Sequence, residues 1–172
     1  MTILEFKQNL TGGGARANQF RVDLTFPMVA TAGAEAGRKS QFLCTAASMP
    51  GSTIGVAPVY YRGREVKLPG ERTFQNWQIT IINDTDFAIR NAFEGWMNVI
   101  NDVAENSGIT NPNLITSQMY VTQMDRNNED LKKYTFIDCW PVNMSDIQLS
   151  FDANDRVEDF TVELAYAYWL PE

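Results

Sequence analysis

Residues 140–169 read WPVNMSDIQLSFDANDRVEDFTVELAYAYW, and this stretch decides the fold. Between residues 159 and 168, apolar side chains occupy every second position and alternate with acidic or small ones. A period of two fits a β-strand and does not fit a helix. The stretch therefore predicts two strands joined by a turn, with one face in a core and the other facing solvent, a channel or a partner. The apolar face consists of Phe160, Val162, Leu164, Tyr166 and Tyr168.

Other segments show the same strand pattern. Residues 73–83 alternate in the same way, whereas residues 85–101 change to a spacing of three or four. That change predicts one amphipathic helix, capped by Asn83 or Asp84. We therefore expect a mainly β fold, an antiparallel barrel or sandwich with one external helix. The expected strands are 18–26, 39–47, 73–83, 118–124, 132–140, 146–151 and 157–169.

Length and composition predict a single globular domain. The chain has 172 residues, of which 44% are hydrophobic. It contains no run of about 18 apolar residues, so no membrane segment is expected. The first ten residues do not resemble a signal peptide, which predicts synthesis and folding in a cytoplasm. Residues 1–17 are expected to be a flexible terminal segment, and residues 27–39 a long, mobile connection.

Residues 48–72 combine the glycines and prolines of a loop with the apolar side chains of a strand. Two short ribbon strands around Arg62–Arg64 reconcile the two signals, and they predict an extended arm. A connection of this length within a domain is usually functional. So much apolar surface also needs a partner to cover it. The residues expected to contact that partner are Gly51, Ile54, Val56, Val59, Tyr60, Tyr61, Arg62, Val66 and Leu68.

The composition argues against most catalytic and metal chemistry. The chain contains no histidine, which rules out serine or cysteine triads with histidine and removes the commonest metal ligand. Gly12–Gly14 lack the lysine of a phosphate loop, and residues 152–159 lack the glycine and spacing of a calcium loop, so a hairpin turn is expected there. Cys44 and Cys139 lie among apolar strand residues, which favours free core thiols. We expect no enzyme activity, metal or cofactor.

The net charge limits the kind of partner that the surface can hold. Fourteen basic residues against 21 acidic ones give a formal charge of −7. Such a surface is unsuited to gripping nucleic acid. An acidic wall is nevertheless compatible with nucleic acid that passes without sticking, because like charges repel.

Three segments resemble the tail tube proteins of contractile-tailed bacteriophages. They are residues 16–23 (RANQFRVD), residues 69–84 (PGERTFQNWQITIIND), and residues 140–152 followed by 160–169. Their order is that of the family, and together they span about residues 16–169, which is more specific than any single motif. The chain departs from the family pattern mainly at residues 27–39, where the connection is longer.

The resemblance implies a structural subunit of the virion. Hexameric rings would stack into a tube inside a contractile sheath, and each subunit would add strands to a continuous inner barrel that conducts DNA into the host. The implied partners are further copies of the chain, the tail sheath, baseplate and tail terminator proteins, and a tape-measure protein in the lumen. Assembly is expected in the host cytoplasm. Residues 48–72 then match the family's long loop, which packs on neighbouring subunits and rings.

With this resemblance, the acidic strand face becomes a candidate lumen wall. Asp159 and Glu163 suit a channel through which DNA slides, because the wall repels the phosphates. Thr161 and Asp23 are further lumen candidates. An ordinary solvated strand face is the alternative for these residues.

Two other functions stay open at this point. The first is the inner tube of a type VI secretion system or of a bacteriocin-like contractile machine, which conducts protein or ions. The second is a monomeric jelly-roll module whose exposed Trp and Tyr side chains stack on sugars. A tube predicts rings or filaments, whereas the jelly-roll module predicts a stable monomer.

Overall fold

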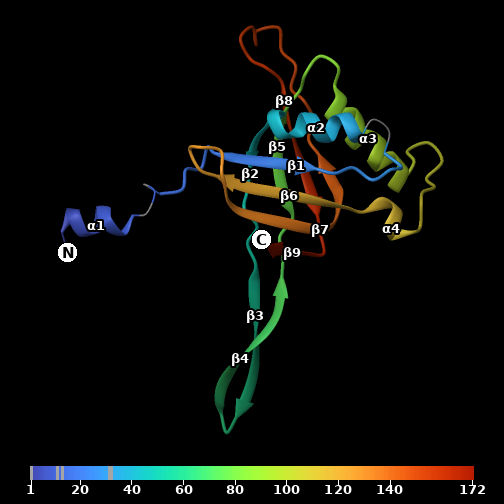
Figure 1. Ribbon diagram of the computed structural model, residues 1–172. Helices are drawn as coiled ribbons and strands as arrows, with labels where there is room; N and C mark the ends of the chain where they lie inside the picture. The colour runs from blue at the N-terminus through green and yellow to red at the C-terminus, as the bar shows by residue number, and fades with distance from the viewer. Residues whose placement is uncertain (1, 11, 13, 31–32) are drawn as a thin grey trace.

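The computed structural model describes residues 2–10, 12, 14–30 and 33–172, and it shows a β-rich body from which a long hairpin projects (Figure 1). Most of the regular structure is antiparallel strand, as the sequence predicts. The helices are α1 (Ile3–Asn9), α2 (Gly33–Leu43), α3 (Ala88–Ile100) and α4 (Pro112–Ile115). The strands are β1 (Phe20–Leu24), β2 (Cys44–Ala47), β3 (Thr53–Tyr61), β4 (Arg64–Thr73), β5 (Trp77–Ile82), β6 (Ser117–Met124), β7 (Asp130–Met144), β8 (Asp159–Ala165) and β9 (Tyr168–Pro171).

The long strand β7 belongs to both sheets of the body. Its first part pairs with β6 and β9, and residues 140–144 pair with β8. We call β1, β6, the first part of β7 and β9 sheet A, and residues 140–144 with β8, β5 and β2 sheet B. The strands of sheet A run across those of sheet B (Figure 1). The body is therefore a sandwich of two sheets that share one strand.

The register of β5 and β8 confirms the predicted alternation. Ile79 lies opposite Val162, and Ile81 lies opposite Phe160. These four side chains are buried. Burying the apolar side of both strands against one core fixes this register, because a shift by one residue would turn every side chain over.

Aromatic side chains fill the space between the sheets. Trp77 of β5 stacks on Phe136 of β7, with ring centroids 4.2 Å apart. Helix α3 closes the other side of the core with Phe93 and Trp96, both fully buried. The indole of Trp96 donates to the carbonyl of Ile115 at 2.7 Å, so its polar atom is satisfied inside the core.

Helix α2 corrects the prediction of a mobile connection at 27–39 and a strand at 39–47. Residues 33–43 are helical, only Cys44–Ala47 form a strand, and residues 31–32 of the expected connection lie outside the described residues. Glycine disfavours a helix, but here it permits close packing on β1. A Cβ on Gly37 would lie 2.7 Å from the carbonyl oxygen of Leu24. Tertiary packing thus outweighs a weak local propensity.

The remaining helix predictions are partly correct. The helix expected at 85–101 is confirmed as α3, but it begins at Ala88 because Phe87 has a left-handed backbone, with φ of 54°. The side chain of Asp86, and not that of Asn83 or Asp84, accepts from the amide of Ala88 at 3.0 Å. The expectation of a single helix is wrong, since α1, α2 and α4 are also present. Helix α1 lies within the segment 1–17 that was expected to be flexible.

Two strand predictions near the C-terminus are wrong. Residues 146–151 belong to a long loop without regular structure, and the turn expected at 152–155 is part of that loop and not of a tight hairpin. The strand expected at 157–169 is two strands that join different sheets. Between them the amide of Ala167 donates to the carbonyl of Ile137 at 2.9 Å, so the chain crosses from β8 to the edge of sheet A.

Ser40 joins α2 to β1, and its replacement should lower stability. Its hydroxyl is fully buried, accepts from the amide of Leu24 at 3.2 Å and donates to the carbonyl of Gly37 at 2.8 Å. Ser40→Ala leaves the Leu24 amide without this acceptor, so we expect a loss of about 1–3 kcal/mol in the free energy of unfolding. Urea unfolding of the unassembled subunit measures it. The exposed Ser48→Ala serves as the control, and equal stability of the two variants would contradict the assigned contact.

Candidate assembly surfaces

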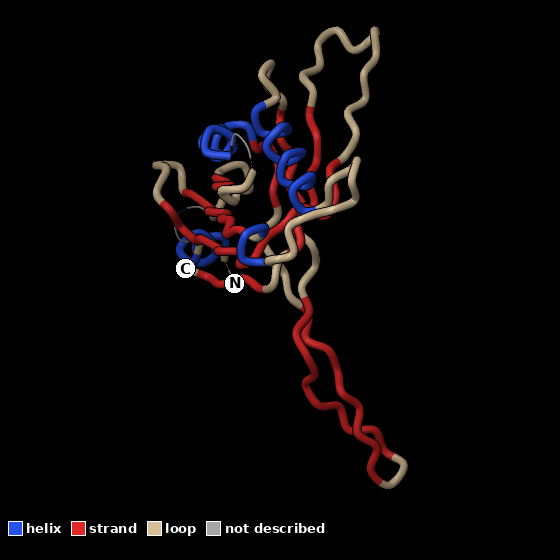
Figure 2. Tube along the Cα trace, turned by 90° about the vertical axis from the view of Figure 1, so that its right-hand side faces the viewer, coloured by secondary structure: helices blue, strands red, loops and turns tan. Residues whose placement is uncertain are grey.

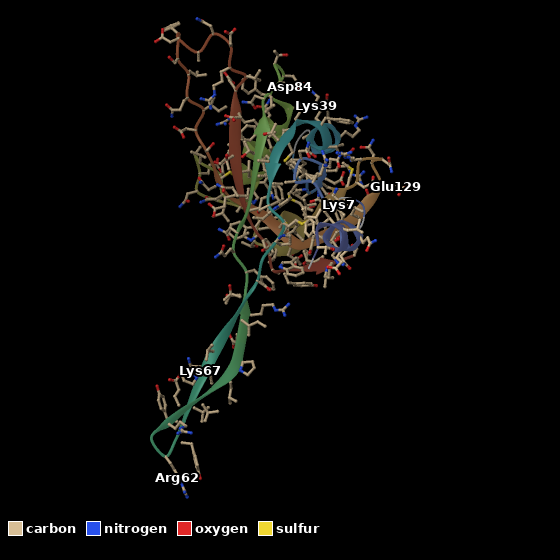
Figure 3. The ribbon with its side chains drawn as sticks, turned by 90° about the vertical axis from the view of Figure 1, so that its left-hand side faces the viewer. Lys7, Lys39, Arg62, Lys67, Asp84 and Glu129 are labelled. Atoms are coloured by element: carbon tan, nitrogen blue, oxygen red, sulfur yellow. The ribbon has the colours of Figure 1, made fainter. Side chains whose placement is uncertain are left out.

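Strands β3 and β4 form the predicted arm, a two-stranded ribbon that leaves one end of the body (Figure 3). Arg62 and Gly63 make the turn, with φ of 48° and 80°. Positive φ at both central residues is the pattern of a type I′ turn, whose twist matches that of paired strands. Every residue of β3 and β4 is exposed. A lone hairpin is at best marginally stable in water, so this ribbon calls for a covering partner.

The arm has one largely apolar face. Val59 pairs with Val66, and Ala57 pairs with Leu68. Residues directly opposite each other in an antiparallel pair share a face, so these side chains lie together. The structure places the predicted contact residues on this ribbon, except for Gly51 at its base, whose carbonyl accepts from the indole of Trp169 at 3.2 Å. The others are Ile54, Val56, Val59, Tyr60, Tyr61, Arg62, Val66 and Leu68.

A second surface is the outward face of sheet B. Asp159, Thr161 and Glu163 alternate with the buried side chains of β8, so the structure brings these three lumen candidates onto one face. The hydroxyl of Thr161 lies 3.3 Å from that of Thr80 on β5. The amide of Asn76 donates to Glu163 at 3.1 Å, which holds that carboxylate in place.

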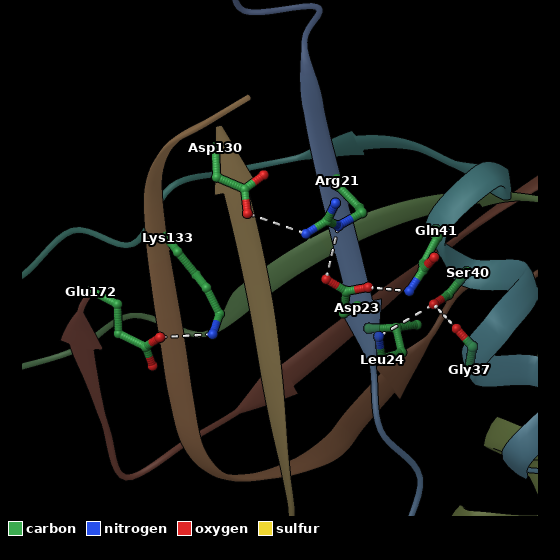
Figure 4. A network of polar contacts seen from close by, with 9 residues as sticks. All are labelled: Arg21, Asp23, Leu24, Gly37, Ser40, Gln41, Asp130, Lys133 and Glu172. Atoms are coloured by element: carbon green, nitrogen blue, oxygen red, sulfur yellow. Dashed lines mark hydrogen bonds and ion pairs between the residues drawn. The ribbon is translucent and has the colours of Figure 1, made fainter. Parts of the chain in front are cut away.

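Asp23, the fourth lumen candidate, lies apart from the other three. It belongs to β1 of sheet A, where Arg21 donates to its carboxylate at 3.2 Å and Gln41 of α2 donates to its second oxygen (Figure 4). Arg21 also contacts Asp130 at 3.5 Å. Asp23 is thus part of a polar network that ties α2 and β7 to β1.

The two sheets differ in charge. The strands of sheet B contain Asp159 and Glu163 and no lysine or arginine. The strands of sheet A carry three basic residues and three acidic residues. Sheet A therefore balances its charge, whereas the outward face of sheet B is acidic. The charged residues of sheet A are Arg21, Lys132, Lys133, Asp23, Asp130 and Asp138.

Sheet B also has two free edges, which sequence reasoning did not locate. In the described part of the chain, β2 pairs only with β5, and residues 140–144 pair only with β8. Because all three pairings of sheet B are antiparallel, its two edge strands run in opposite directions. A second copy of β2 beside residues 140–144 would continue the antiparallel pattern. The periodicity of a single strand does not reveal which of its sides stays unpaired.

Neither a reactive cysteine nor a metal-binding cluster accompanies these surfaces in the described ranges. Burial raises the pKa of the Cys139 and Cys44 thiols to about 12, so both stay protonated near neutral pH. Both cysteines are free, as predicted. Outside the five undescribed positions, no group of acidic and cysteine side chains is placed to hold a metal ion. The part of the structure that is described also has no helix long and apolar enough to span a membrane.

The family described as phage tail tube protein matches residues 15–172 of the chain. The chain belongs to this family. The tail tube protein of Serratia phage KSP90 is 30% identical over 167 residues, which cover 96% of this chain and 94% of that protein. Tail tube protein gp19 of Enterobacteria phage T4 is 28% identical over 162 residues, which cover 92% of this chain and 93% of that protein.

A solved structure has the same fold. A chain in the sheath–tube complex of an extracellular contractile injection system, in the extended state, superposes with a TM-score of 0.61 at 11% identity and covers 96% of both chains. Phage tail tube proteins are structural components of the virion tail and not enzymes, which confirms the predicted family, class and location. The glycan-binding module receives no support.

Proposed function

We propose that this tail tube protein forms hexameric rings that stack into a tube inside a contractile sheath, and that the tube conducts DNA. The observation that carries the proposal is sheet B, with two free edges of opposite direction and an acidic outward face. Copies joined edge to edge remove every open edge of this sheet once the ring closes. The number six comes from the family resemblance.

The proposed ring implies where the lumen candidates on β8 lie. If sheet B forms the inner wall, Asp159, Thr161 and Glu163 line the channel, and the core and α3 lie outside it. Asp23 on sheet A then belongs to the body of the subunit and not to the wall. The absence of basic residues from the strands of sheet B supports passage of DNA without binding.

The arm is proposed to join one ring to the next. Its apolar face lies beyond the body, where none of the other described elements of the same chain covers it. The sheath, baseplate and tail terminator proteins are proposed as partners of the assembled tube, and a tape-measure protein as the occupant of its lumen. A chain of the solved sheath–tube complex has the same fold as this protein, and this likeness supports the sheath protein as a partner.

Negative-stain microscopy of the purified protein tests the proposal. We expect rings with a central hole at moderate concentration, and stacked tubes at high concentration. Sedimentation velocity on the same samples should show a species of six subunits. Monodisperse monomers at every concentration and salt would overturn the proposed function.

A further inference from the structure

The loop of residues 145–158 lies at the end of the body opposite to the arm. In Figure 1 the arm points down and this loop, in orange to red, rises at the top. Figure 2 shows the same separation from a second direction. In a stack of identically oriented rings, the arm end of one ring therefore faces the loop end of the next. Such a head-to-tail contact repeats without closing, as a tube requires.

The loop exposes apolar side chains that nothing in the described structure covers. Leu149 is 79% exposed, Val157 is 64% exposed and Phe151 is fully exposed. The more sheltered Ile147 packs against the hydrophobic core and anchors the first limb of the loop. Side chains of this size rarely stay in water in a cluster, so the loop resembles half of an interface.

The loop and the arm carry opposite charge. Residues 145–158 hold four carboxylates and one guanidinium, a net charge of −3. Residues 53–73 hold four basic and two acidic side chains, a net charge of +2 in a chain whose total is −7. The arm is thus a basic extension of an acidic protein. The loop charges are Asp146, Asp152, Asp155, Glu158 and Arg156, and the basic arm residues are Arg62, Arg64, Lys67 and Arg72.

The basic side chains near the tip of the arm are available to a partner. The guanidinium of Arg62 lies over the ring of Tyr61, 5.3 Å from its centroid. Among the described residues, Arg62, Arg64 and Lys67 form no ion pair. Apolar and basic groups therefore occur together at the tip, as apolar and acidic groups do on the loop.

We propose that the tip of each arm docks on the loop 145–158 of a subunit in the adjoining ring. Val59 and Tyr61, which share the apolar face of the arm, pack against Leu149, Phe151 and Val157, while the basic arm residues face the loop carboxylates. The inference rests on the proposed stacking of rings and names the surface that receives the arm. Complementary charge sets the register of the contact and disfavours arm-to-arm pairing, because like charges repel.

Paired charge reversals test this docking. Arg64→Glu with Lys67→Glu changes the arm, and Asp152→Lys with Asp155→Lys changes the loop. Each pair places like charges opposite one another, so we expect intact rings but about tenfold fewer stacked tubes, counted by negative-stain microscopy. Combining both pairs should restore the tubes, since the attraction returns with its signs exchanged.

A matched control separates the contact from net charge. Glu105→Lys with Glu129→Lys, at two exposed sites outside the loop, has the same charge effect as the loop reversal. Combined with the arm reversal, it should not restore stacking. Undiminished tubes in the loop reversal, or restoration by the control pair, would overturn the docking. Wild-type protein that forms no rings would contradict the proposed function itself.

Discussion

A protein in which an Asn-Gly turn replaces residues 58–67 of the arm is expected to form rings but no tubes. Ala57 and Leu68 lie opposite each other in the register of the ribbon, and the amide of Leu68 can donate to the carbonyl of Ala57, so an Asn-Gly turn between them closes a short hairpin without moving its base. The change removes the paired valines and both tyrosines of the arm. If these side chains hold one ring to the next, their loss removes the main stacking contact. Negative-stain microscopy and sedimentation velocity distinguish single rings from tubes.

The rest of the subunit should not be affected by this shortening. All residues of β3 and β4 are exposed, and the buried core contains none of them. The thermal midpoint of the unassembled subunit is therefore expected to stay within a few degrees of the wild-type value. Gly55 and Gly70, whose backbones approach closely at the base of the arm, are retained. Tubes of normal length from the shortened protein would show that stacking depends on other surfaces.

The parts of the fold that the sequence predicts are those decided by local periodicity. Strands β5 and β8 bury one face each, so a period of two identifies both the strands and their inward side chains. Helix α3 is found for the same reason, with a period of three to four. Helix α2 is missed because Gly33 and Gly37 count against a helix locally, although Gly37 packs closely on the distant strand β1 and Gly33 on Phe26 just after it.

Alternation also misleads where a surface is exposed. Ile147, Leu149 and Phe151 alternate as in a strand, yet the last two face solvent, and none of the described strands pairs with them. An exposed interface and a buried strand face both place apolar residues at every second position. Periodicity therefore predicts which side of a segment is apolar, but it does not predict what covers that side.

The same limit explains the partial success with the lumen candidates. Asp23 and Asp159 each lie on the polar side of a strand in which polar and apolar residues alternate. The sequence does not show that these two strands belong to different sheets. Only the pairing of β1 with β6, and of β8 with β5 and β7, separates them. The two free edges of sheet B were missed for this reason too, since an edge is defined by the neighbour that a strand lacks.

Asp159→Lys with Glu163→Lys is expected to leave tubes intact while slowing the passage of DNA. Both side chains lie on the outward face of sheet B, so the change replaces two negative charges per subunit with two positive ones, a net change of +4, without touching the core. Such a wall attracts phosphate, and retention should weaken steeply as salt rises. The measurement is the time course of DNA release from particles that carry the variant tube, at two salt concentrations. Asp159→Asn with Glu163→Gln should have a much smaller effect, and Glu105→Lys with Glu129→Lys supplies the same charge elsewhere. Because a surface outside the channel never meets the genome, equal release times for the lysine variants at both locations would place Asp159 and Glu163 outside the lumen.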